Sequence, residues 1–160
     1  MDIVIFTTGG TIDKVYFDRK SEFQVGSPQI AEVLTEANVT LDFQVVPLMR
    51  KDSLELTAVD RAAIRAAVES SPARHIVITH GTDTMVETGR ALLGIPGKVI
   101  VLTGAMQPAR FRTTDAVFNI ACAITAAQLL PDGVRIAMNG HIFDPAQTRK
   151  NVEMNRFEPI

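Results

Sequence analysis

Four short hydrophobic segments of this chain each run directly into a turn of small polar residues. Because they are rich in β-branched residues without polar alternation, they are typical of strands that are buried on both faces of a parallel sheet. A fifth segment alternates apolar and polar residues before it turns apolar, and it also predicts a strand. The five predicted strands are 3–6, 41–48, 76–78, 99–102 and 136–138.

Helical spacing of apolar residues marks the segments between these strands. The local signals agree: Pro28 precedes the first helix, Thr57 can cap the second, and Gly94 and Pro131 follow the last two. The alternation of strands and helices predicts an α/β fold, a single doubly wound domain of the Rossmann or flavodoxin type with a mainly parallel sheet. The predicted helices are 29–37, 60–69, 84–93 and 114–130.

One internal segment interrupts this alternation. Residues 13–26 are charged and unusually long for a connection between a strand and a helix. Connections of this length within a compact domain are often functional lids. We predict a lid over the site, which a short hairpin would form, and a plain surface loop is the alternative.

The composition is that of an ordinary globular protein. Of the 160 residues, 46% are hydrophobic and 21% are charged, and we expect them to form one domain, 1–160. With a net charge of −2, the chain lacks the excess of basic residues that is typical of nucleic-acid binding, so no nucleic-acid partner is expected. No apolar run approaches the length of a membrane span, and the chain enters a strand without a targeting signal. These features predict a cytoplasmic protein without membrane contact.

Motifs for common cofactors are absent from the sequence. The turn at 7–12 lacks the glycine spacing of a dinucleotide-binding loop, and no phosphate-binding loop follows any strand. His75, His80 and His141 are scattered singly, which is not a zinc-binding pattern. Cys122 is the only cysteine, and its apolar neighbours predict a buried structural thiol. We expect neither a cofactor nor a metal.

Polar residues gather where the predicted strands end. In doubly wound sheets, ligands bind outside the carboxyl ends of the strands, so these turns predict a site for a small polar molecule. A threonine hydroxyl becomes a nucleophile when a partner activates it and backbone N–H groups hold the oxyanion. Thr11 follows two glycines that can supply such donors, and Lys150 could complete a relay with Thr82 and Asp83. The alternative is that the threonines at these strand ends, Thr11, Thr79, Thr82 and Thr84, only cap helices.

Three segments resemble motifs of the L-asparaginase family. Residues 7–12 (Thr-Thr-Gly-Gly-Thr-Ile) and 78–85 (Ile-Thr-His-Gly-Thr-Asp-Thr-Met) resemble its two signature segments. Residues 101–108 resemble its G-A-M-R-P turn, with Gln107 in place of arginine. The order and approximate spacing match across the chain, but only over the family's amino-terminal domain. The resemblance implies a domain of this type without the smaller carboxyl-terminal domain.

The resemblance also implies roles for the matching residues. Thr11 resembles the primary nucleophile. Thr82, Asp83 and Lys150 resemble a second catalytic cluster, in which Asp83 would also bind the α-amino group of the substrate. Ser53 resembles the serine that holds the substrate α-carboxylate.

Two positions depart from the family's pattern. Leu54 stands where the family often has a polar residue, frequently glutamine, so a side-chain donor is missing. The loop tyrosine of the family would fall near Phe23, which has no hydroxyl. Tyr16, the only tyrosine, is therefore the candidate for that role, provided that the lid brings it to Thr11.

The activity implied by the resemblance is hydrolysis of L-asparagine to L-aspartate and ammonia through an acyl-enzyme, without cofactor or metal. Backbone N–H groups around Gly10 and at Gly81 and Thr82 would hold the oxyanion. Two other classes stay open: a non-catalytic amino-acid-binding domain, and an amidase component of a larger complex. Glutaminase activity is an alternative within the same class. An apolar surface left by the absent domain predicts a homo-oligomer, a dimer or a tetramer.

Overall fold

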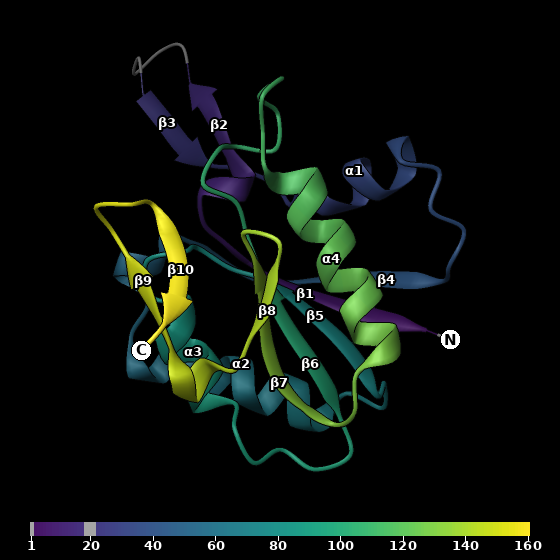
Figure 1. Cartoon of the computed structure of the whole chain (residues 1–160). Helices are drawn as coiled ribbons and strands as arrows, with labels where there is room; N and C mark the ends of the chain where they lie inside the picture. The colour runs from purple at the N-terminus through teal and green to yellow at the C-terminus, as the bar shows by residue number, and fades with distance from the viewer. Residues whose placement is uncertain (1, 18–21) are drawn as a thin grey trace.

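The computed structural model describes residues 2–17 and 22–160, and a six-stranded sheet lies at its centre (Figure 1). Its strands are β1 (Ile3–Gly9), β4 (Phe43–Lys51), β5 (His75–Thr79), β6 (Val99–Thr103), β7 (Gly133–Met138) and β8 (His141–Phe143). Their spatial order is β4-β1-β5-β6-β7-β8. The first five run parallel, and β8 pairs antiparallel with β7. The predicted α/β fold with a mainly parallel sheet is confirmed.

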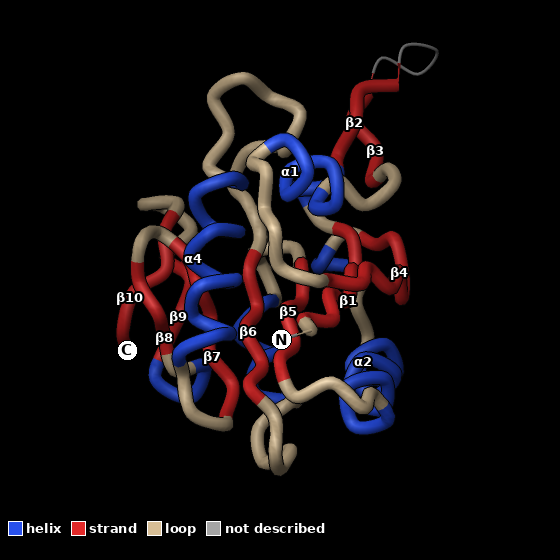
Figure 2. Tube along the Cα trace, turned by 90° about the vertical axis from the view of Figure 1, so that its right-hand side faces the viewer, coloured by secondary structure: helices blue, strands red, loops and turns tan. Residues whose placement is uncertain are grey.

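Helices cover both faces of the sheet (Figures 1 and 2). The helices α1 (Ile30–Glu36) and α4 (Ala116–Leu129) pack on one face, and α2 (Ala58–Ser70) and α3 (Met85–Ala91) pack on the other. Each central strand contributes to both layers of the core: in β5, Val77 faces the first pair of helices and Ile76 and Ile78 face the second. This double burial explains the continuous apolar runs. No helix in the described residues is long and apolar enough to cross a membrane.

The chain reverses its direction across the sheet at β1. From β1 it passes through α1 to β4 on one side, and from β4 it passes through α2 to β5 on the other side. The carboxyl ends of β1 and β5 therefore flank the topological switch point, where doubly wound sheets bind their ligands. The turns that contain Thr11 and Thr82 follow these two strands.

Two small hairpins are added to this core. The first, β2 (Lys14–Phe17) with β3 (Glu22–Val25), lies within the segment predicted as a lid; residues 18–21 of that segment lie outside the described residues. The second, β9 (Thr148–Asn151) with β10 (Arg156–Pro159), lies beyond the last predicted strand. Figure 1 shows the first hairpin projecting from the top of the molecule and the second lying beside α3.

The predicted helices and strands are found with shifted ends. The second helix begins two residues earlier than predicted, at Ala58, because Thr57 and Asp60 form a reciprocal capping box. The strand predicted over 41–48 is displaced to Phe43–Lys51.

Candidate active site

The turns that follow β1 and β5 touch each other at the switch point. A Cβ built on Gly10 would lie only 2.5 Å from both the Cα and the N of Gly81, so no side chain fits there. Gly10 also has a φ of +88°, which favours glycine. Thr11 and Thr82, which follow these glycines, therefore lie on adjoining turns at one rim. Thr82 is buried and Thr11 is half-buried.

Ser53 lies against the second of these turns. It begins the 3₁₀ turn Ser53–Glu55 after β4, and a Cβ built on Gly81 would lie 2.7 Å from its Oγ. Thr84 occupies the N-cap position of α3, but its hydroxyl donates to the Ser53 carbonyl at 2.7 Å and makes no capping bond. Helix capping therefore does not account for this threonine, and Ser53 joins the predicted site.

Lys150 completes a compact polar group with Thr82 and Asp83. Its Nζ donates to Thr82 Oγ1 at 2.8 Å and to Asp83 Oδ1 at 2.6 Å. The lysine side chain is 11% exposed, whereas that of Asp83 is 39% exposed. The oxygen of the Thr82 hydroxyl thus accepts a bond from the ammonium, and the hydroxyl proton can be donated to another acceptor.

The second hairpin places Lys150 in this group. Along β9, Thr148 and Lys150 point inward, while Arg149 points outward and pairs with Glu158 at 2.8 Å. Arg90 of α3 fixes the base of the hairpin, because its guanidinium donates to the Pro145 carbonyl at 2.9 Å and to the Thr148 carbonyl at 3.2 Å. The helix that follows Asp83 therefore also holds the strand that carries the lysine.

One backbone donor expected at the rim is already engaged. The Gly10 N–H donates to the Lys51 carbonyl at 2.9 Å, so this N–H is not available to an oxyanion in this conformation; that other N–H groups around Gly10 hold the oxyanion stays a prediction. This bond links the end of β1 to the end of β4. The Thr82 N–H has no acceptor among the described residues, and it is the better candidate donor.

The turn after β6 packs behind the second turn. Gly104 contacts the His80 carbonyl oxygen so closely that a Cβ would overlap it. The Asp115 carboxylate accepts bonds from the N–H groups of Met106, at 2.9 Å, and Gln107, at 3.0 Å. The Gln107 side chain, which stands where the family has arginine, is exposed.

The first hairpin is anchored at its base by Asp13. The Asp13 carboxylate accepts from the Gln29 N–H at 2.9 Å, and its carbonyl accepts from the Gly26 N–H at 2.8 Å. Burial raises the pKa of Asp13 to about 6, against the opposing effects of the Gln29 bond and the Arg50 charge. This residue holds both ends of the hairpin together.

The hairpin also contacts the turn that carries Ser53. Lys14 pairs with Asp52 at 3.1 Å, and Asp52 accepts from the Leu54 N–H at 3.1 Å. Burial raises the pKa of Asp52, but these bonds outweigh burial and the pKa lies below its ordinary value. Leu54 itself is 72% exposed at the rim.

Tyr16 does not join the polar group in this conformation. The residue is 54% exposed, and its ring packs edge-on against Phe23, with 5.5 Å between centroids. Phe23 in turn packs on Phe111, at 5.6 Å. The role of Tyr16 as the loop residue stays a prediction.

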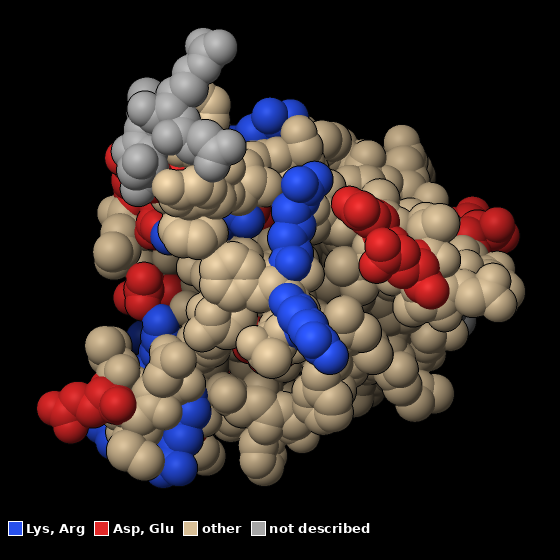
Figure 3. Space-filling model, turned by 90° about the horizontal axis from the view of Figure 1, so that it is seen from above, with Lys and Arg blue, Asp and Glu red and all other residues tan. Residues whose placement is uncertain are grey.

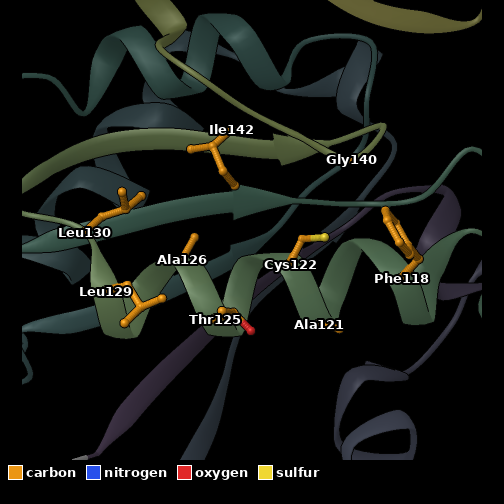
Figure 4. A pocket seen from close by; sticks show the side chains of 9 residues that line it. All are labelled: Phe118, Ala121, Cys122, Thr125, Ala126, Leu129, Leu130, Gly140 and Ile142. Carbon is orange, nitrogen blue, oxygen red and sulfur yellow. The ribbon is translucent and has the colours of Figure 1, made fainter.

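An apolar groove lies between α4 and the β8 edge of the sheet, where residues of the helix face Ile142 (Figure 4). Its volume is about 440 Å³. Cys122 packs against the edge of the core but also lines this groove, so it is only half-buried and the expectation of a buried thiol is wrong. The groove is lined by Phe118, Ala121, Cys122, Thr125, Ala126, Leu129, Leu130, Gly140 and Ile142.

Comparison with known proteins gives a consistent result. The family profile "Asparaginase, N-terminal" matches residues 2–158. A glutaminase-asparaginase of Acinetobacter glutaminasificans is 29% identical over 96% of this chain and 51% of its own length. The solved structure of the thermostable L-asparaginase from Thermococcus kodakarensis superposes with a TM-score of 0.84 and 26% identity, over 100% of this chain and 51% of that one.

A second type of relative also matches. One component of the glutamyl-tRNA(Gln) amidotransferase of Methanococcus vannielii is 42% identical over 84 residues, which are 51% of this chain and 20% of that protein. The chain spans about half the length, or less, of the curated relatives it matches.

Proposed function

This chain belongs to the asparaginase family, and from that premise we propose that it hydrolyses the side-chain amide of L-asparagine to L-aspartate and ammonia. The observation that carries the proposal is the Lys150 ammonium, bonded to both the Thr82 hydroxyl and the Asp83 carboxylate beside the turn of Thr11. A threonine that only caps a helix needs no lysine bonded to its hydroxyl. Acyl transfer does need a basic or charged partner that activates a hydroxyl.

In the proposed reaction, the Thr11 hydroxyl oxygen attacks the amide carbon. The C–N bond then breaks, and the hydroxyl proton leaves with the nitrogen as ammonia. Water attacks the resulting ester, its hydroxyl stays on the product carboxyl group, and its remaining proton returns to Thr11. Thr82, polarised by Lys150, orients this water, and the Thr82 N–H stabilises the oxyanion in both steps.

The same rim offers contacts for the backbone groups of the amino acid. The Asp83 carboxylate is 39% exposed and can accept the substrate α-ammonium. Ser53, adjacent to Gly81, is the proposed contact for the α-carboxylate. Gly10 contributes by its close approach to Gly81 rather than through its N–H group, and Tyr16 would act after closure of the hairpin.

We further propose a cytoplasmic homo-oligomer, a dimer or tetramer, with the groove along α4 as a contact between protomers. Phe118, Leu129 and Ile142 are large apolar residues on this groove, and each is at least 43% exposed. Contiguous exposed apolar surfaces usually mark contacts with other proteins. Sedimentation at micromolar concentration tests the proposal, and a monomer there contradicts it.

The relatives keep two other functions open. The similarity to a component of a glutamyl-tRNA(Gln) amidotransferase favours an amidase that acts within a larger complex. On the face shown in Figure 3, basic and acidic side chains are scattered among uncharged ones, which does not favour a nucleic-acid partner for this chain alone. A domain that binds amino acids without turnover is the non-catalytic alternative.

Ammonia release separates these functions. The purified chain is incubated with L-asparagine and, side by side, with L-glutamine, and ammonia is measured over time. Turnover of asparagine, faster than that of glutamine, is expected. Binding of aspartate without ammonia release indicates the non-catalytic domain, and activity that appears only with a partner protein indicates the amidase component.

A further inference from the structure

A buried histidine lies beneath the second turn and has no part in the reaction described above. His80 is 0% exposed, its Nδ1 lies 2.7 Å from the Gly81 carbonyl oxygen, and its Nε2 lies 2.7 Å from Thr88 Oγ1. Arg61 of α2 donates from Nε to the same Thr88 hydroxyl at 3.1 Å. These bonds form a chain that leads from α2 through α3 to the turn of Thr82.

The chemistry of the donors fixes the direction of each bond in this chain. The Gly81 carbonyl can only accept, so Nδ1 carries the proton and donates to it. Nε2 of the neutral ring then accepts the proton of the Thr88 hydroxyl, whose oxygen accepts in turn from the Arg61 guanidinium. Burial lowers the pKa of His80 to about 4, so the ring is neutral near pH 7, as this arrangement requires.

Because His80 holds the Gly81 carbonyl, the Thr82 N–H of the same peptide group is also held in one orientation. In a trans peptide the C=O and N–H bonds point in opposite directions, so the Thr82 N–H points away from His80. No described residue accepts a bond from this N–H. The bond that the carbonyl accepts from the ring also polarises the peptide and strengthens its N–H as a donor.

We propose that His80, held as the Nδ1-protonated neutral tautomer by Thr88 and Arg61, is a positioning residue for the oxyanion. It orients the Gly81–Thr82 peptide so that the Thr82 N–H meets the charge that develops on the amide oxygen. The inference rests on the proposed amide hydrolysis. It predicts that the tautomer of a buried ring affects the rate of the chemical step and has little effect on binding of the substrate.

A matched pair of substitutions at Thr88 tests this role. Thr88→Val keeps nearly the same volume but removes the hydroxyl, whereas Thr88→Ser keeps the hydroxyl and loses a methyl group. Removal of an oxyanion donor costs roughly a hundredfold or more in kcat, so a loosened donor should cost less, about tenfold. We expect this loss in Thr88→Val with a nearly unchanged KM, and a kcat close to wild type in Thr88→Ser.

Two further measurements separate positioning from a structural role. The ¹⁵N shifts of the His80 ring should show a protonated Nδ1 in the wild type and a mixture of tautomers in Thr88→Val. The β-aldehyde analogue of asparagine, which forms a tetrahedral adduct with a hydroxyl, should bind Thr88→Val about tenfold more weakly. Aspartate, which forms no such adduct, should bind both proteins alike.

Several results would overturn the proposal. A kcat near wild type in Thr88→Val, an equal loss in Thr88→Ser, or an unprotonated Nδ1 in the wild type each contradicts it. The ¹⁵N measurement uses the wild-type protein, so it decides the tautomer even where the valine variant does not fold. Absence of ammonia release by the wild type, with the expected tautomer present, instead refutes the proposed function.

Discussion

Replacement of Lys150 by methionine removes the centre of the proposed site. Methionine keeps much of the apolar stem but loses the ammonium that donates to Thr82 at 2.8 Å and to Asp83 at 2.6 Å. The neighbouring Arg149 offers a matched control. It lies on the same strand, points to the opposite side and pairs with Glu158 at 2.8 Å. Arg149→Met therefore removes a positive charge from β9 without touching the rim.

The expected loss depends on how well water can replace each bond. A hydrogen bond to a charged group contributes about 1.5–3 kcal/mol. The Asp83 side chain is 39% exposed, so water replaces much of its bond. Thr82 is only 6% exposed, so its bond counts almost in full. Together they give about 3 kcal/mol. Because the proposed relay uses these bonds in the transition state, their loss lowers kcat by roughly two orders of magnitude, at about 1.36 kcal/mol per tenfold change.

Steady-state ammonia release with asparagine measures the effect on kcat, and calorimetry with aspartate measures binding. Lys150→Met should lose roughly a hundredfold in kcat and keep part of its affinity for aspartate, because Ser53 and Asp83 remain. Arg149→Met should keep both values within about twofold, since exposed ion pairs contribute little. A Lys150→Met enzyme with wild-type turnover, or an equal loss in Arg149→Met, would refute the reasoning.

Other predictions concern the threonines, the base of the hairpin and the lid. Thr11→Ala and Thr82→Val should each lower kcat for asparagine by roughly a hundredfold or more, and circular dichroism should show folded proteins. Because burial raises the pKa of Asp13 from 3.8 to about 6, the folded state binds this proton more tightly than the unfolded state. The free energy of unfolding should therefore fall by up to about 3 kcal/mol as the pH rises from about 4 to about 6, and Asp13→Asn should remove this slope in urea unfolding curves. Tyr16→Phe should lower kcat more than it raises KM, and aspartate should slow hydrogen exchange in Lys14–Phe17; unchanged exchange contradicts closure.

The parts of the site that lie on core strands could be predicted from the sequence. Continuous apolar runs such as 76–78 identify strands that are buried on both faces. Because helices alternate with these strands along the chain, the strands run parallel and their carboxyl ends lie at the same edge of the sheet. Thr11, Thr82 and Asp83 lie in the turns that follow two such runs. Their proximity is therefore a consequence of hydrophobic patterning and needs no detailed geometry.

Lys150 could be named from the sequence as a candidate partner of Thr82 and Asp83, and the family resemblance supported it, but the strand that carries it could not be predicted. The hairpin that carries it has few apolar residues, and β9 is the polar sequence Thr-Arg-Lys-Asn. This strand is held by Arg90 and by pairing with β10, neither of which leaves a hydrophobic pattern. Strands of this kind form because of tertiary contacts, so local propensity does not detect them.

The partner of the Gly10 N–H could not be predicted from the sequence either. Glycines beside a nucleophile indicate available N–H groups, yet the Gly10 N–H bonds to the Lys51 carbonyl at the end of another strand. In the sequence His80 is an isolated histidine, because its partners Thr88 and Arg61 lie on two different helices. His80 and Thr88 are eight residues apart, and α3 begins between them. Their distance in space therefore depends on the conformation of the turn and cannot be inferred from the spacing.

The site is thus built from two kinds of support. Thr11, Thr82 and Ser53 lie on turns whose backbones are in contact through Gly10 and Gly81, and the strands before these turns form the core. Their relative positions are fixed by packing, which a bound substrate cannot easily change. Lys150 and Tyr16 lie instead on two-stranded hairpins outside the six-stranded sheet. No described residue of the first hairpin belongs to the core clusters, whereas Phe157 of the second is 3% exposed and lies in the core. The position of the first hairpin therefore responds to ligand binding at a lower free-energy cost. The proposed two-step reaction would use this division, because Thr11 and the Thr82 N–H would stay in place while Tyr16 moves with the first hairpin.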